Sequence, residues 1–278
     1  RKEECCIVSI RALRKSIINM NELTVILDAS RESDQLAEMS AEFALKLGYK
    51  LHFVRLQQTP SSWNILTRST KAKYPAIINA INTARTQMDQ YLQRYRNAGI
   101  KARKSIFYIE EDVTFNPAEL GPLLLGRKKY MAEEGLNKAV MEAYYKENYG
   151  AVMLANDDFD PKDLDDVILL SEFEDLKSST EEMVLSWSEK LNFRLNLLFI
   201  NTLDKFESST SSIAKMKRSI NKGGFSNTKM TVFNAISSLD GARDYTQMQN
   251  CDLLIVENNG EPIAEFSKEL DTNLLFIV

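Results

Sequence analysis

Short apolar runs alternate with longer amphipathic stretches along most of the chain. The first clear run, LTVILDAS (Leu23–Ser30), is bounded by polar residues and is too short for a helix, so it predicts a buried strand. In the next stretch, apolar residues recur every three or four positions, and Gly48 follows where a helix C-cap glycine belongs. This predicts a helix whose buried face comprises Leu36, Met39, Phe43, Ala44 and Leu47.

The alternation continues as far as residue 154. KLHFVRL (50–56) predicts a second strand, a long helical pattern follows and stops at Gly99, and KARKSIFYI (101–109) predicts a third strand. After a longer intervening segment, LNKAVMEAYYKENYGAVMLAND predicts another helix and then a strand over 151–154. We interpret this last strand as the fourth of its unit.

The same order begins again near residue 166. Val167–Leu170 predicts a strand, and SSTEEMVLSWSEKLNF predicts a helix capped by Ser178 or Ser179. RLNLLFIN then corresponds to KLHFVRL, KMTVFNAIS to KSIFYIEED, and NCDLLIVENNG to YGAVMLANDDF. The pattern predicts an N-terminal segment (1–22) followed by two tandem domains, 23–160 and 166–278.

Strands that alternate with helices predict an α/β fold. Each domain is expected to be Rossmann-like, with a mainly parallel five-stranded sheet sandwiched by helices. The second domain ends in a fifth strand, Leu274–Val278. We expect CCIVSI (5–10) to fill the corresponding edge of the first domain, where no other fifth strand is evident.

Composition limits the classes of function. The 278 residues carry a net charge of -4, which gives no broad attraction to nucleic acid. Three cysteines without a paired CxxC spacing fit a reducing compartment, so we expect a cytoplasmic protein. The longest apolar runs have the length of strands, short of the roughly 20 residues that span a bilayer.

Candidate catalytic and metal-binding groups are few. His52 is the only histidine and lies in a strand pattern, so we expect a sheet residue with one satisfied nitrogen. The acidic linker NDDFDPKDLDD (156–166) lacks EF-hand spacing, and we predict neither a metal site nor a catalytic residue. The insertion Thr114–Gly135 contains three consecutive apolar residues, Leu123, Leu124 and Leu125, which must be shielded from water. We expect them to be buried inside the domain.

The order of these elements resembles the universal stress protein family. The resemblance lies in VILDASRESDQLAEMSAEFALKLGYKLHFVRL, in NAGIKARKSIFYI, and in CDLLIVENNG followed by a helix and NLLFIV. It implies a five-stranded parallel α/β domain related to adenine-nucleotide-binding folds. In ATP-binding members, an aspartate after the first strand contacts the adenine end, and Asp28 and Ser30 match this element.

The family's phosphate-binding stretch, Gly-x2-Gly-x9-Gly-Ser/Thr after the fourth strand, is missing from both copies. Residues 156–160 contain no glycine, and no second or third glycine follows Gly260. Glycine matters here because the backbone must approach phosphate oxygens closely. Carboxylates occupy these turns instead: Asp157 and Asp158 in the first copy, Glu257 and Glu261 in the second.

The resemblance therefore implies the fold more strongly than nucleotide hydrolysis. We expect a non-catalytic sensor or regulatory interaction module without a cofactor. If an adenine nucleotide binds, we expect it in the first copy, at Asp28, Ser30 and the backbone beside Val54. Two alternatives stay open: the cytoplasmic regulatory domain of a membrane cation/proton antiporter, at the inner face of that membrane, and an ATP-binding stress protein with weak ATPase activity.

The resemblance also implies how the copies associate. Family members dimerise through edge strands, so the two copies are expected to form a pseudo-two-fold pair within one chain, with Leu274–Val278 at their contact. Further partners consistent with this interpretation are a second copy of the chain, a regulated protein, or an attached membrane transporter.

Overall fold

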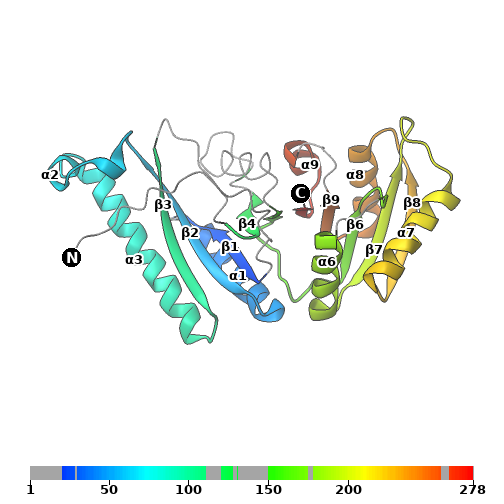
Figure 1. Ribbon diagram of the computed structural model, residues 1–278, viewed down its shortest axis with the longest axis horizontal. Coiled ribbons are helices and arrows are strands. Elements are labelled where there is room, and N and C mark those ends of the chain that lie inside the picture. Colours follow the sequence, from blue (N-terminus) through cyan, green and yellow to red (C-terminus); the bar gives the residue numbers. More distant parts are fainter. Residues whose placement is uncertain are drawn as a thin grey trace.

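The computed structural model describes residues 21–28, 30–110, 120–127, 130, 150–174, 178–257 and 263–277. Strands and helices alternate along the chain (Figure 1), and the fold is of the α/β class, as predicted. The first half contains β1 (Glu22–Ile26), α1 (Arg31–Leu47), β2 (Lys50–Thr59), the 3-10 helix η1 (Trp63–Ile65), α2 (Arg68–Lys71), α3 (Pro75–Asn97), β3 (Ala102–Glu110), β4 (Leu123–Gly126) and β5 (Ala151–Ala155).

The second half repeats the alternation of strands and helices. It contains β6 (Asp166–Leu170), α6 (Ser178–Leu191), β7 (Arg194–Asn201), α7 (Ser209–Gly223), β8 (Thr228–Asn234), α8 (Ser238–Gln249), β9 (Leu253–Glu257), α9 (Ile263–Glu269) and β10 (Asn273–Ile277). None of the helices in the described parts of the chain is long and apolar enough to cross a membrane.

The strands form one ten-stranded sheet in the order β3-β2-β1-β4-β5-β10-β9-β6-β7-β8. Neighbouring strands are parallel except for β5 and β10, which pair antiparallel with Leu275 opposite Met153. The order of the first five strands is therefore mirrored in the last five, and a pseudo-two-fold axis passes between β5 and β10. The prediction that the C-terminal strand lies at the contact between the two copies is confirmed.

The interpretation of residues 151–154 as a fourth strand is wrong. These residues belong to β5, the fifth strand, and β4 lies between β1 and β5. The strand was missed because β4 has only four residues and lies between glycines in what looked like an insertion. Its Leu123, Leu124 and Leu125 are buried, so the prediction that they find cover inside the domain is confirmed.

This correction also bears on the prediction that residues 5–10 form the edge strand of the first domain. CCIVSI lies outside the described residues, but the fifth position that we expected it to fill is taken by β5. Since β5 pairs with β4 on one side and with β10 on the other, that position has no open edge.

Two hydrophobic layers cover the sheet. α1, α3, α6 and α7 pack on one face, and α8 and α9 pack on the other. The first layer is continuous across both halves: Phe43 of α1 meets Trp187 of α6 edge to face at 4.8 Å between ring centroids. Trp187 Nε1 also donates to Tyr49 Oη over 3.0 Å. One sheet and a shared hydrophobic layer thus join the halves, and the domain limits 23–160 and 166–278 stay a prediction.

Helix α1 follows the pattern read from the sequence. Ser30 is its N-cap, Glu32 and Asp34 stand in its first turn, and Gly48 ends it at φ 72°, a left-handed conformation that suits glycine. Leu36, Phe43, Ala44 and Leu47 are buried and Met39 packs against them, so the predicted apolar face is confirmed.

Candidate functional site

In an open parallel sheet, ligands bind beyond the carboxyl ends of the strands, where the strand order reverses. The order reverses twice here, between β1 and β4 in the first half and between β6 and β9 in the second. These two switch points are the candidate sites, and the residues at the ends of those four strands determine their chemistry.

In the first half, Asp28 follows β1 and lies at the N-terminus of α1. Its Oδ1 accepts hydrogen bonds from the Ser30 N–H (2.7 Å) and from the Ser33 hydroxyl (2.8 Å). Ser30 Oγ in turn accepts from the Ser33 N–H over 3.4 Å. The structure therefore brings the predicted pair Asp28 and Ser30 together, and these bonds fix the turn that starts the helix.

Ser33 was missed by the sequence analysis, because the capping-box signal three positions after a helix N-cap is Glu or Gln and this position holds serine. It is fully buried, and its hydroxyl also accepts from the Asp28 N–H over 2.8 Å. The third predicted residue, Val54, has a buried side chain, and its carbonyl accepts from the Leu27 N–H over 2.8 Å. Val54 thus lies beside the end of β1, with its carbonyl engaged in the sheet.

Arg55 is a further residue that the sequence analysis did not single out. Its Nη1 donates to the Leu27 carbonyl over 3.3 Å, and its Nε is buried without a hydrogen-bond partner among the described residues. Burial lowers the pKa of Arg55, and the carboxylate of Asp28 acts in the opposite direction. The available signal was a lone charge in the apolar run LHFVRL.

Because β4 is the fourth strand of the first half, the phosphate motif must be sought after β4 and not after residues 151–155. The true fourth strand ends at Gly126 and is followed in the sequence by the basic run Arg127, Lys128 and Lys129, whereas residues 156–160 follow the fifth strand. Counted from Gly126 with the spacing of the motif, the later glycine positions hold Lys129 and Ala139. The motif is absent here too, but the residues that follow β4 in the sequence are basic, which the sequence analysis had not foreseen.

The side chain of Arg127 is hydrogen-bonded to the second half of the chain. Its Nη1 donates to the Thr272 carbonyl and its Nη2 to the Ser267 carbonyl, each over 2.7 Å. Burial lowers the pKa of the Arg127 guanidinium, with the Asp271 carboxylate opposing this effect. The first cation after β4 therefore joins the two halves.

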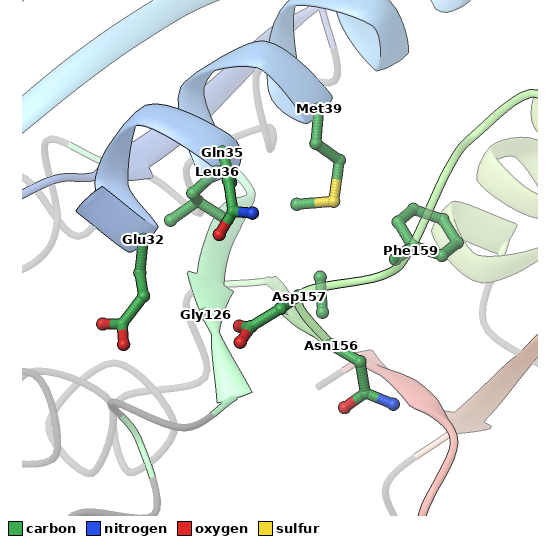
Figure 2. Close-up of a pocket in the computed structure, with 9 residues that line it drawn as sticks. Glu32, Gln35, Leu36, Met39, Gly126, Asn156, Asp157 and Phe159 are labelled. Carbon is green, nitrogen blue, oxygen red and sulfur yellow. The ribbon is translucent and has the colours of Figure 1, made fainter.

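A small pocket of about 50 Å³ opens beside Gly126, between α1 and the residue run that follows β5. Figure 2 shows Glu32 and Asp157 directed toward the same side of it, near the end of β4. Asp157 thus reaches the first switch point from the fifth strand, whereas Asp158 lines a different depression. The pocket is lined by Glu32, Gln35, Leu36, Met39, Gly126, Ala155, Asn156, Asp157 and Phe159.

In the second half, the switch point holds a carboxylate of the protein itself. Glu257 ends β9 and is buried, and it accepts hydrogen bonds from Ser171 Oγ (2.5 Å) and Thr180 Oγ1 (3.4 Å). Thr180 lies in the first turn of α6, where the helix dipole favours a negative charge. Glu261, the other predicted acidic residue of this turn, lies outside the described residues.

The loop after β6 is held by the same cluster. Ser171 Oγ accepts from the Phe173 N–H over 3.1 Å, and Phe173 has a φ of 54°, which is rare for a bulky residue. Beside this loop is a pocket of about 270 Å³, lined by Leu170, Ser171, Glu172, Ile200, Thr202, Asp204, Lys205, Ile236, Ser237, Ser238, Val256 and Glu257.

His52 lies away from both switch points. It is buried in β2, and its Nε2 is 2.8 Å from Ser105 Oγ, which confirms a sheet residue with one satisfied nitrogen. Burial, and next the nearby Arg103, lower the pKa of His52 to about 4, while Glu22 acts in the opposite direction. The imidazole is therefore neutral near pH 7.

No protein-family model matches the chain, and no curated protein shows a significant match. Among solved structures, a universal stress protein from Archaeoglobus fulgidus DSM 4304 aligns with a TM-score of 0.67 and 11% identity, over 93% of this chain and 98% of that one. A putative universal stress protein from Pseudomonas aeruginosa UCBPP-PA14 aligns with a TM-score of 0.58 and 8% identity, over 92% of each chain.

The cytoplasmic domain of a prokaryotic cation chloride cotransporter aligns over 93% of this chain and 95% of its own, with 13% identity and a TM-score of 0.48. The two better alignments span both halves of the chain, and identities this low carry the fold alone. The chain has the fold of the universal stress proteins, with two copies of the domain in one polypeptide.

Proposed function

We propose that the chain is a non-catalytic regulatory module that acts through contacts with other molecules, and that neither switch point holds ATP through a phosphate loop. The observation that carries this proposal is the Glu257 carboxylate at the N-terminus of α6. A phosphate group at that place would meet a buried carboxylate in place of backbone N–H groups.

The same argument applies to the first half with different residues. A triphosphate needs several convergent N–H donors or cations and close approach of the backbone. The glycines that permit such an approach are absent after β4, and Glu32 and Asp157 line the pocket beside Gly126. Arg127, the first basic residue after β4, already donates to two carbonyls.

The phosphates of an adenine compound that binds this protein should therefore add little to its binding free energy. We propose the first half as its site, with Asp28 and Ser30 at the base or ribose and the backbone of Val54 beside them. No cofactor is needed for the proposed role. Adenosine and AMP are expected to bind no more weakly than ATP.

The test is titration calorimetry of the full chain with adenosine, AMP and ATP, with and without magnesium, together with a phosphate-release assay. We expect affinities that differ by less than about threefold and no hydrolysis. ATP bound at least about tenfold more tightly than AMP, a gap of about 1.4 kcal/mol, would show a phosphate site and overturn the proposal. Hydrolysis that Asp28→Asn abolishes would overturn the non-catalytic assignment.

A charge variant sharpens this test. Glu257→Gln preserves the shape of the side chain and removes its negative charge. We expect this variant to bind ATP better relative to adenosine than the wild type does, because like-charge repulsion at the α6 N-terminus is removed. An unchanged ratio would mean that the Glu257 carboxylate does not oppose phosphate binding.

A transporter-attached role rests on the family resemblance alone. The coding sequence that precedes Arg1 tests it directly. A series of membrane helices encoded there would make this module the regulatory domain of a transporter, and its cytoplasmic location would follow from the topology of those helices.

A further inference from the structure

Exposed apolar side chains gather at the mouth of the second-half pocket. The loop between β7 and α7 carries Leu203 and Phe206, and the loop between β8 and α8 carries Ile236. Their side chains are 80%, 74% and 79% exposed. Three of the seven large apolar side chains that are exposed among the described residues therefore lie in two neighbouring loops, and we call this group the apolar rim.

The apolar rim adjoins the pocket directly. Ile236 itself lines the pocket, and so do the residues on either side of Leu203, which are Thr202 and Asp204. The strand ends contribute the apolar side chains of Leu170, Ile200 and Val256 to the lining. At about 270 Å³, the pocket has room for one large side chain that enters between the two loops. Figure 1 shows these loops at the same end of the second half.

The charged groups around the pocket are mainly carboxylates. Among the described residues, Glu172, Asp204 and Glu257 line it together with a single cation, Lys205, which forms an ion pair with Glu172. This excess of negative charge favours a positively charged partner and opposes an anionic lipid surface. Apolar anchors surrounded by charged groups are the usual composition of a protein docking site.

We propose that the apolar rim and its pocket dock a segment of another protein that presents a large apolar side chain next to lysine or arginine. The apolar side chain enters the pocket against Leu170, Ile200 and Val256, and the flanking cations face Glu172 and Asp204. This inference rests on the proposed function as an interaction module, since it identifies the surface through which that module acts.

The experiment uses the full chain and a displayed library of random 12-residue peptides. The triple variant Leu203→Ser, Phe206→Ser, Ile236→Ser serves for counter-selection, and its unfolding curve checks that it is folded, which is expected because all three side chains are exposed. Selected peptides should carry a large apolar residue beside lysine or arginine. They should bind the triple variant at least about tenfold more weakly than the wild type, a loss of about 1.4 kcal/mol.

Ile65→Ser is the matched control, because Ile65 is 82% exposed but lies in the first half. This variant should bind the selected peptides as the wild type does. Failure to select peptides, enrichment of acidic peptides, or equal binding to the triple variant would overturn the proposal.

Two further measurements distinguish the other occupants. If vesicles of 70% phosphatidylcholine and 30% phosphatidylserine bind the wild type but not the triple variant, the rim is a membrane contact and the proposal is wrong. If sedimentation shows a dimer that the triple variant loses, the rim joins two copies of this chain, and the proposal is again wrong. Nucleotide titrations decide the non-ATP function separately, so the two proposals can fail independently.

Discussion

The guanidinium of Arg127, one residue beyond β4, donates to the carbonyl oxygen of Thr272, one residue before β10, over 2.7 Å. The contact spans the pseudo-two-fold axis and joins the fourth strand of one copy to the fifth strand of the other. A side chain in the turn that would carry the phosphate loop thus serves the association of the two halves.

Arg127→Leu should lower the free energy of unfolding by about 2–4 kcal/mol, since the carbonyls of Ser267 and Thr272 lose a charged donor. Urea unfolding curves measure this change. Arg218→Leu on the exposed surface of α7 is the control and should change stability by less than about 0.5 kcal/mol. Equal stability of the two variants would contradict a joining role for Arg127.

Removal of residues 272–278 should make the chain aggregate or melt at a markedly lower temperature. Without β10, both β5 and β9 lose a hydrogen-bonded neighbour, and unpaired apolar edges associate. Leu275→Asp tests the same contact at full length, because Leu275 is buried opposite Met153. Light scattering and thermal melting measure both variants. A soluble truncated chain with an unchanged melting temperature would contradict the pairing.

The stability of the protein should fall between pH 7 and pH 5 because of His52. Its pKa in the folded chain is about 4, below the ordinary value of 6.5, so in this window the unfolded chain binds a proton that the folded chain does not. The expected loss from this residue is about 2 kcal/mol.

His52→Asn should remove that loss, and the second half supplies the precedent. Asn196 holds the equivalent position in β7 and is hydrogen-bonded to Thr231, as His52 is to Ser105. Urea unfolding at pH 7 and pH 5 compares the variant with the wild type. An identical pH dependence would show that another group is responsible.

Tyr49, two residues beyond the end of α1, and Trp187 of α6 should behave as a coupled pair. Tyr49→Phe and Trp187→Phe each remove the 3.0 Å hydrogen bond between Trp187 Nε1 and Tyr49 Oη. The double variant should therefore lower the free energy of unfolding by less than the sum of the two single variants. We expect a coupling energy of about 0.5–1.5 kcal/mol in a double-mutant cycle. Tyr74→Phe combined with Trp187→Phe is the additive control, because the Tyr74 ring contacts Trp63 instead. Additivity in both cycles would contradict the contact.

The candidate site could be predicted only in part. Asp28 and Ser30 were found because a helix N-cap follows a strand within a few residues, and such local patterns can be read from spacing alone. The sequence analysis named Glu257 as an acidic residue where the second copy would carry its phosphate-binding stretch. Its hydrogen bonds to Ser171 and Thr180, however, join residues more than 70 positions apart. Spacing carries no information on contacts of that kind.

The sequence by itself determined the alternation of strands and helices, the internal duplication and the apolar face of α1, because these depend on periodicity and capping over a few residues. Only the tertiary structure decided that Leu123–Gly126 is the fourth strand and that Ala151–Ala155 pairs with β10. Sheet order is set by hydrogen bonds and packing between distant segments, and a four-residue strand carries too little pattern to reveal its neighbours. The same long-range pairing brought Asp157 to the first switch point and directed Arg127 toward the second half.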